Sequence, residues 1–208
     1  MIEASTLTPS NWESFYVILG SSSAALIGLQ FVVITLVAER RAHQAEHYTL
    51  SAFATPTVVH FAGALLVSAA MTTPWPTPMA VGIALVVCGV GGMSYGVRVI
   101  LRALRQTTYK PVWEDWLWHV VLPDLAYIAL AIGGRLVYAR ANVGPFFVAS
   151  AALALLFIGI HNAWDTVTYI VTSARDDNER QEPERQRGPE DAVNTSPTPT
   201  ASPSRPRP

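Results

Sequence analysis

Five long apolar runs constrain the fold of this chain more than any other feature of its sequence. They cover residues 15–38, 51–72, 79–101, 117–139 and 145–171. An α-helix rises 1.5 Å per residue, so a run of about 20 apolar residues crosses the hydrocarbon core of a bilayer. A helix also satisfies its backbone hydrogen bonds internally, as lipid requires of a spanning segment. The runs therefore predict an all-α, polytopic membrane helix bundle with about five transmembrane helices.

The charge content supports lipid as the solvent for most of the chain. Charged residues make up 14% of the sequence, whereas a soluble globular protein carries about 25%. Charges and prolines gather after Thr172, and such a segment cannot bury enough apolar surface to fold. We therefore expect a five-span transmembrane domain over residues 1–173 and a disordered cytoplasmic tail over residues 174–208.

Two function classes conflict with the composition. The net charge of −1 provides no basic surface for nucleic acid. The single cysteine, Cys88, permits neither a disulfide framework nor a thiolate cluster for zinc. The bilayer is therefore the first partner that the sequence indicates.

Basic residues in the short loops predict the orientation of the spans. Cytoplasmic loops of membrane proteins carry the excess of lysine and arginine. On the opposite side of the membrane, Arg140 is the only lysine or arginine in the predicted loops. The ends of the first, third and fifth runs are followed by Arg40, Arg41, Arg102, Arg105, Lys110 and Arg175. We therefore expect the N-terminus outside and the C-terminus in the cytoplasm, as in a bacterial inner-membrane protein.

Small residues and prolines predict how the helices pack. Small residues let helix backbones approach closely in lipid, within one chain or in a homo-oligomer. Pro56 and Pro123 lie inside the second and fourth runs, and each tends to kink its helix because proline has no N–H. The ridges of small residues are Gly20, Ala24 and Gly28 in the first run and Gly89, Gly92 and Gly96 in the third.

Polar and ionisable residues within the runs are the candidate functional residues. Ionisable residues in a membrane cost about 2.5–3.5 kcal/mol each on insertion scales, so they generally face the protein interior and mark function. His161 and Asp165 are four residues apart and therefore share a helix face. With the predicted orientation, the cluster lies near the midplane or in the cytoplasmic half of the bilayer. Its members are Gln30, His60, Arg98, Asp124, His161, Asn162 and Asp165.

Four interpretations of this cluster stay open at the level of sequence. It could be structural or bind a membrane partner, with Arg98 neutralising Asp124 or Asp165. It could form a proton or cation channel or transporter subunit, in which Asp124, His161 and Asp165 relay protons or coordinate a cation. It could serve an intramembrane enzyme on a lipophilic substrate, with Asp124 or Asp165 as general acid or base and His161 as its partner. His60 and His161, on two helices at comparable depth, could hold a b-type haem.

The start of the chain resembles a group of known proteins. The segments WESFY, over Trp12–Tyr16, and GSSSAALIGLQFV, over Gly20–Val32, are similar to the first span of a broad group of uncharacterised small bacterial multi-span integral membrane proteins. The likeness lies mainly in residues 12–40. It implies a bacterial inner-membrane location and transfers no catalytic or ligand residue.

Overall fold

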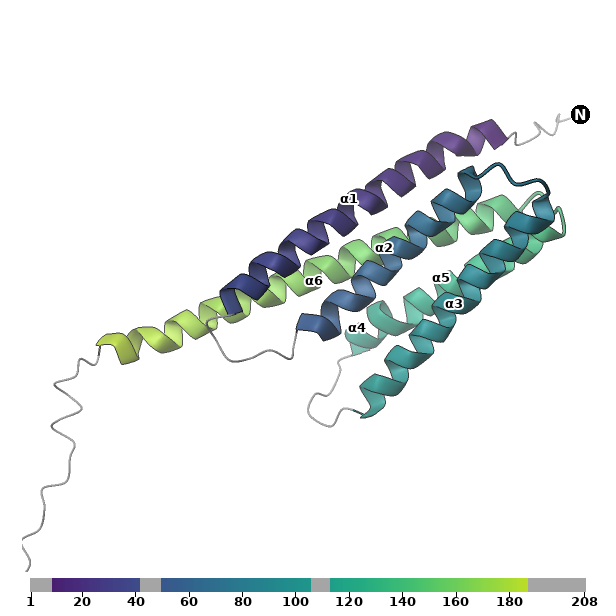
Figure 1. Ribbon diagram of the computed structural model, residues 1–208. Coiled ribbons are helices and arrows are strands. Elements are labelled where there is room, and N and C mark those ends of the chain that lie inside the picture. The colour runs from purple at the N-terminus through teal and green to yellow at the C-terminus, as the bar shows by residue number, and fades with distance from the viewer. Residues whose placement is uncertain (1–8, 42–49, 106–112, 187–208) are drawn as a thin grey trace, which may run out of the picture. The chain divides into compact units, whose positions relative to one another are not determined.

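The structure of the chain is a computed structural model that describes residues 9–41, 50–105 and 113–186. Every regular element in these ranges is a helix (Figure 1), so the all-α prediction is confirmed. In chain order the elements are α1 (Pro9–Arg41), α2 (Leu50–Thr72), α3 (Pro78–Arg105), α4 (Trp113–Trp116), the π-helical turn η1 (Leu117–Val121), α5 (Leu122–Tyr138) and α6 (Gly144–Gln186).

The chain divides into two units, residues 1–166 and 167–208, and the boundary falls inside α6. The first unit contains all the candidate functional residues. In the second unit α6 continues to Gln186, past the predicted end of the membrane domain at residue 173. Arginine, glutamate and glutamine in residues 174–186 are favourable helix formers, and the disorder of the tail stays a prediction. The rest of the predicted tail lies outside the described residues.

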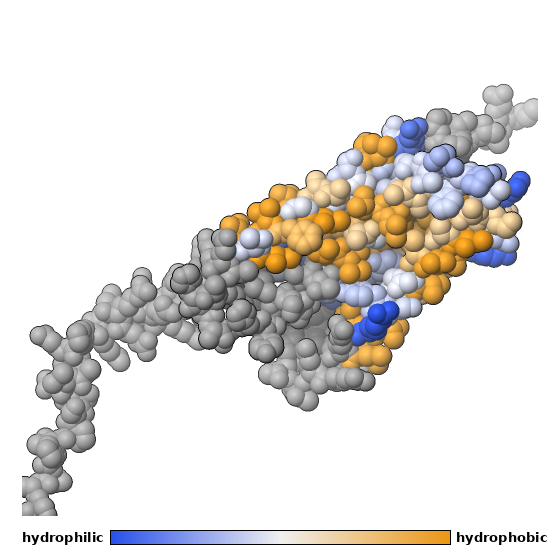
Figure 2. Space-filling model, viewed as in Figure 1, coloured by the Kyte–Doolittle hydropathy of each residue, from blue (hydrophilic) through white to orange (hydrophobic). Residues whose placement is uncertain are grey.

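Four helices in the described ranges are long and apolar enough to cross a membrane. Their outward faces carry large apolar side chains, among them Ile18, Val87 and Phe157, which are 67%, 63% and 60% exposed. Figure 2 shows such apolar residues spread over the visible surface of the described helices. Exposed apolar surface of this extent is unfavourable in water and natural in lipid. The four segments, which suggest a membrane protein, are Trp12–Leu36, Pro78–Leu101, Leu117–Tyr138 and Gly144–Thr168.

α3 and α5 pack backbone to backbone through glycine. A methyl group on Gly89 would lie 2.8 Å from the Tyr127 carbonyl oxygen, and one on Gly82 would lie 2.8 Å from the Gly134 carbonyl oxygen. Only hydrogen fits at these positions, because backbone atoms cannot rotate away from a side chain. The small-residue ridge predicted in the third run is therefore used within the chain, against α5.

Glycines also lie at contacts between the other helices. A methyl group on Gly20 of α1 would lie 3.0 Å from the Ser68 Cβ of α2, whereas one on Gly28 would meet no atom within 4 Å. Between α2 and α6, Gly159 makes room for the ring of Phe61, which is fully buried. The ridge predicted in the first run is thus in contact at one end and open at the other.

The backbone is disturbed just before Pro123, as the sequence predicts. Leu122 donates its N–H to the Leu117 carbonyl, a bond from residue i to residue i−5 that defines the wide turn η1. Proline lacks an N–H, and its ring crowds the carbonyl four residues earlier in an α-helix. A wider π turn relieves that crowding, and such turns recur at functional sites. α5 therefore begins at Leu122 directly after the π turn, with Pro123 and Asp124 in its first turn.

Candidate functional site

A buried histidine and a buried tyrosine join α2 to α5. His60 Nδ1 lies 3.3 Å from the Tyr127 hydroxyl, and the side chains are 2% and 3% exposed. Gly63, one turn after His60, leaves space for the hydroxyl, since a methyl group there would lie 3.2 Å from it. The Tyr127 hydroxyl is therefore positioned by two residues of α2, His60 and Gly63.

Asp124 lies one turn before Tyr127 on the same face of α5, as their spacing of three residues requires. A methyl group on Gly96 would overlap the Asp124 carboxylate, and one on Gly92 would overlap the Tyr127 ring. Two glycines of α3, four residues apart, thus leave space for two polar side chains on one face of α5. We call His60, Tyr127 and Asp124 the polar triad.

Both ends of the polar triad carry buried atoms without a hydrogen-bond partner. Within the described residues, His60 Nε2 and Asp124 Oδ1 have none. Leaving a buried donor or acceptor unpaired costs about 1–3 kcal/mol, and more for a charged group. Such atoms in a folded protein call for a functional role or a bound water molecule. The triad therefore contains one hydrogen bond, between His60 and Tyr127, and an unused polar atom at either end.

Further buried polar side chains lie at the depth of His60. Phe61 contacts Gly159 across antiparallel helices, so Thr57 lies level with the turn of α6 that contains Asn162. Asn162 is 1% exposed, and neither polar atom of its amide has a partner in the described part of the chain. We call these side chains the polar layer, and each of them is 5% exposed or less. Its members are Gln30, Thr57, His60 and Asn162.

The depth of Gln30 follows from an aromatic contact at the start of the bundle. The rings of Trp12 and Phe146 are 5.0 Å apart, and α1 and α6 run in the same direction (Figure 1). Gln30 and Trp164 are equally far along their helices from these two rings. Gln30 therefore lies within a turn of Asn162 in depth.

His161 and Asp165 form a second polar group, next to η1. His161 Nδ1 lies 3.0 Å from Asp165 Oδ2, an ion-pair distance without the alignment of a hydrogen bond. The Trp118 ring lies 3.6 Å from the His161 ring, measured between centroids, at an angle of 41°. The two polar side chains are 26% and 48% exposed, so this group lies at the surface of the bundle.

The predicted cluster is therefore distributed over distinct contacts. His60 and Asp124 come together through Tyr127, whereas His161 pairs with Asp165 and stacks on Trp118. Spacing alone could have identified Tyr127, because it follows Asp124 by three residues. The contacts of Gly92 and Gly96 with these side chains could not be predicted from the sequence, since glycine ridges occur wherever helices pack closely.

Arg98 does not neutralise either aspartate in the structure. Its side chain is exposed, and in the described ranges no ion pair joins it to Asp124 or Asp165. The same ranges contain no group of three or more His, Cys, Asp or Glu side chains that could hold a metal ion. The His60 ring contacts Tyr127, and the His161 ring contacts Trp118. A haem bound between the two histidines stays a prediction.

The four long apolar helices suggest a helical membrane protein. Comparison with models of protein families, with curated proteins and with solved structures found no match. The function must therefore be inferred from the polar groups themselves.

Proposed function

We propose that this chain is a five-span protein of the bacterial cytoplasmic membrane that conducts protons, as a channel or transporter subunit. Four spans are the long apolar helices, and α2 would supply the fifth, since 23 residues extend about 35 Å. The N-terminus would lie outside, in keeping with the distribution of arginine and lysine in the loops. The resemblance of residues 12–40 to small bacterial multi-span proteins supports the same location.

The observation that carries the proposal is the polar triad with an unused atom at each end. A proton path needs groups that exchange protons, hydrogen bonds between them, and free positions at entry and exit. Asp124 Oδ1 would supply one free position and His60 Nε2 the other. The Tyr127 hydroxyl, which both donates and accepts, would connect them.

One step of this path needs a water molecule. No hydrogen bond joins Asp124 to Tyr127 in the described part of the chain, and Asp124 Oδ1 has no partner there. A bridging water makes such a link at little energetic cost. The amide of Asn162 and the side chain of Gln30 lie at a depth similar to that of His60 and would provide further polar groups at that level of the bundle.

The geometry favours transfer through the bundle over a purely structural role. A structural cluster in lipid pairs its charges and satisfies its polar atoms. Here the predicted counter-ion, Arg98, is exposed, while Asp124, His60 and Asn162 have buried atoms without a partner in the described residues. Any homo-oligomer would use the open part of the α1 ridge at Ala24 and Gly28, because the α3 ridge contacts α5.

Proton uptake into liposomes tests the proposal. The purified chain is reconstituted with a pH-sensitive dye inside the vesicles, and a potassium gradient with valinomycin drives uptake. Tyr127→Phe removes the hydroxyl link and keeps the ring, and Asp124→Asn removes the acid and keeps the shape. Each should lower the rate at least about tenfold, since positioned proton transfer contributes 10²–10⁴-fold.

Two matched variants control for the loss of a hydroxyl or of a charge. Tyr16→Phe removes a buried hydroxyl that has no partner in the described residues, and Asp165→Asn removes an exposed carboxylate. Both should conduct like the wild type at equal incorporation. A wild-type rate equal to that of empty liposomes, or one unchanged in Tyr127→Phe and Asp124→Asn, would refute the proposal.

A further inference from the structure

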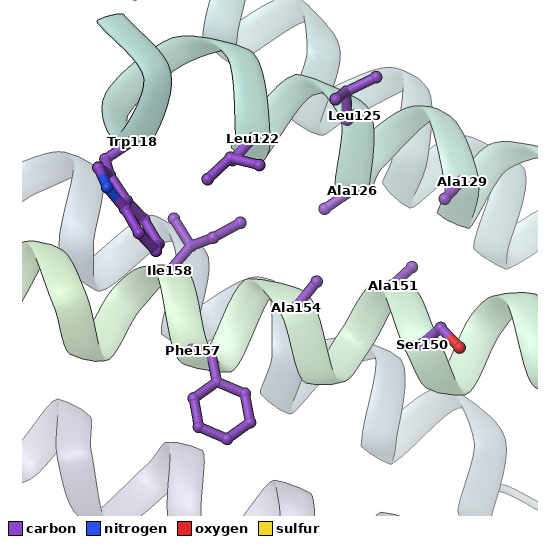
Figure 3. Close-up of a pocket in the computed structure, with 10 residues that line it drawn as sticks. All are labelled: Trp118, Leu122, Leu125, Ala126, Ala129, Ser150, Ala151, Ala154, Phe157 and Ile158. Atoms are coloured by element: carbon purple, nitrogen blue, oxygen red, sulfur yellow. The ribbon is translucent and has the colours of Figure 1, made fainter. Parts of the chain in front are cut away.

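An apolar groove of about 430 Å³ runs between the η1–α5 segment and α6. Figure 3 shows Ala126 of α5 and Ala154 of α6 facing each other across it, with Trp118 and Ile158 at one end. The groove exists because small side chains such as Ala126 and Ala154 do not fill the space between the helices. Its volume lies in the range of roughly 300–1,000 Å³ that is usual for ligand pockets.

The groove has the length of one leaflet. On the α5 side it extends from Trp118 to Ala129, and on the α6 side from Ile158 to Ser150. At 1.5 Å per residue these distances are about 17 Å and 12 Å. Half of a hydrocarbon core about 30 Å thick is about 15 Å. Both walls belong to apolar segments long enough to span, so an acyl chain of the surrounding bilayer fits the groove lengthwise.

Trp118 marks which end of the groove meets the membrane surface. Tryptophan concentrates at the boundary between hydrocarbon and headgroups. Trp118 belongs to the first turn of the span Leu117–Tyr138, and the opposite end of the groove reaches only Ala129 in its middle. A chain in the groove would therefore run from the interface at Trp118 toward the midplane.

A carboxylate continues the groove wall beyond Trp118. Ala154, Ile158, His161 and Asp165 follow at spacings of four, three and four residues, so they share one face of α6. Asp165 lies two turns past Ile158, and its side chain is 48% exposed. Only one of its oxygens, Oδ2, faces His161. An exposed carboxylate in line with an acyl groove complements a headgroup that carries an ammonium ion.

We propose that this groove binds one acyl chain of an aminophospholipid such as phosphatidylethanolamine, with the ammonium group at Asp165. The bilayer supplies the lipid from the leaflet on the Trp118 side. Ala126 and Ala154 leave the space for the chain, and the Asp165 carboxylate selects the headgroup. The site does not involve the polar triad, so it goes beyond the proton path.

Quenching of Trp118 fluorescence by lipids with brominated acyl chains tests the site. The full chain is reconstituted in phosphatidylcholine vesicles that contain increasing mole fractions of brominated phosphatidylethanolamine or brominated phosphatidylglycerol. The signal of Trp118 is the difference between the wild type and Trp118→Phe. Half-quenching should need about threefold less of the amine lipid than of the glycerol lipid, as one exposed charge pair permits.

Three variants separate the acyl contact from the headgroup contact. Ala154→Leu fills the groove and should remove the saturable quenching by both lipids, whereas the exposed Ala25→Leu on α1 should leave it intact. Asp165→Asn should keep the saturable quenching and abolish the preference between the two lipids. Ala154→Leu should also leave proton uptake unchanged, which separates this test from that of the proton path.

Specific results would overturn the site. Equal half-quenching by the two lipids in the wild type would refute selection by Asp165, and unchanged quenching in Ala154→Leu would refute occupation of the groove. If Trp118 is shielded from both brominated lipids and a cysteine at Ser150 cross-links two chains, a second copy covers the groove and the proposal fails.

Discussion

Replacing Gly89 with alanine tests how closely α3 and α5 must pack. The added methyl group would lie 2.8 Å from the Ala131 backbone nitrogen and 2.8 Å from the Tyr127 carbonyl oxygen. Ordinary van der Waals contact begins at 3.4 Å, so the two helices must separate by about 0.6 Å. Backbone atoms cannot rotate aside, and the strain therefore spreads along the whole interface.

The size of the effect follows from that separation. A gap of 0.5–1 Å forfeits about a quarter to a half of the dispersion energy of the contacts that it opens. Overpacking of a close-fitting interior typically costs about 1–3 kcal/mol. Alanine is also favoured over glycine within a helix by up to about 1 kcal/mol, which partly offsets the loss. A control that gains the same propensity without a clash is therefore needed.

Gly91 supplies that control, because a methyl group there would meet no atom within 4 Å. Both variants are unfolded in mixed micelles by increasing the fraction of sodium dodecyl sulfate, with helix content followed by circular dichroism. Gly89→Ala should be less stable than Gly91→Ala by about 1–3 kcal/mol, since the propensity gain cancels between them. If Gly89→Ala is as stable as Gly91→Ala, the close approach of α3 and α5 is not as described.

Four further substitutions test other parts of the bundle by the same unfolding measurement. Tyr127→Phe should lower stability by about 1–3 kcal/mol, because it leaves the buried His60 Nδ1 without its partner; an unchanged midpoint would contradict the bond. Asn162→Leu should raise stability by roughly 1–3 kcal/mol, because it removes two buried unpartnered atoms, while slowing proton uptake; a loss of stability would indicate a bound water or hidden partner. Asp165→Asn should change stability by less than about 1 kcal/mol, as for an exposed pair. Arg98→Gln should likewise leave stability within about 0.5 kcal/mol, since the side chain is exposed, and a severe loss would restore it as a buried counter-ion.

Much of the architecture could be predicted from local sequence. Apolar runs identify spanning helices because length and transfer free energy depend on composition, not on partners. Pro123 predicts a local break for a similar reason, since the missing N–H is a property of one residue. The form of that break, a π turn, depends on how the flanking turns pack. α6 continues to Gln186, where arginine, glutamate and glutamine have high helix propensity.

The candidate site was only partly predictable. The residue types that mark function in lipid are few, so His60, Asp124, His161 and Asp165 can be selected without a structure. Their partners cannot, because helix rotation decides which side chains meet. Tyr127 links His60 to the α5 face that carries Asp124. His161 contacts the ring of Trp118 and not Asp124. Arg98, a plausible counter-ion by depth, faces outward.

The apolar helices, and the few polar residues within them that are costly in lipid, follow from the local sequence alone. Hydrophobic length and the cost of burying polar groups are properties of each segment, so they need no knowledge of its neighbours. The packing of the helices, by contrast, sets which polar residues form the triad and brings Trp118 against His161. Those choices depend on register and rotation between packed helices, as where Gly92 and Gly96 receive Tyr127 and Asp124.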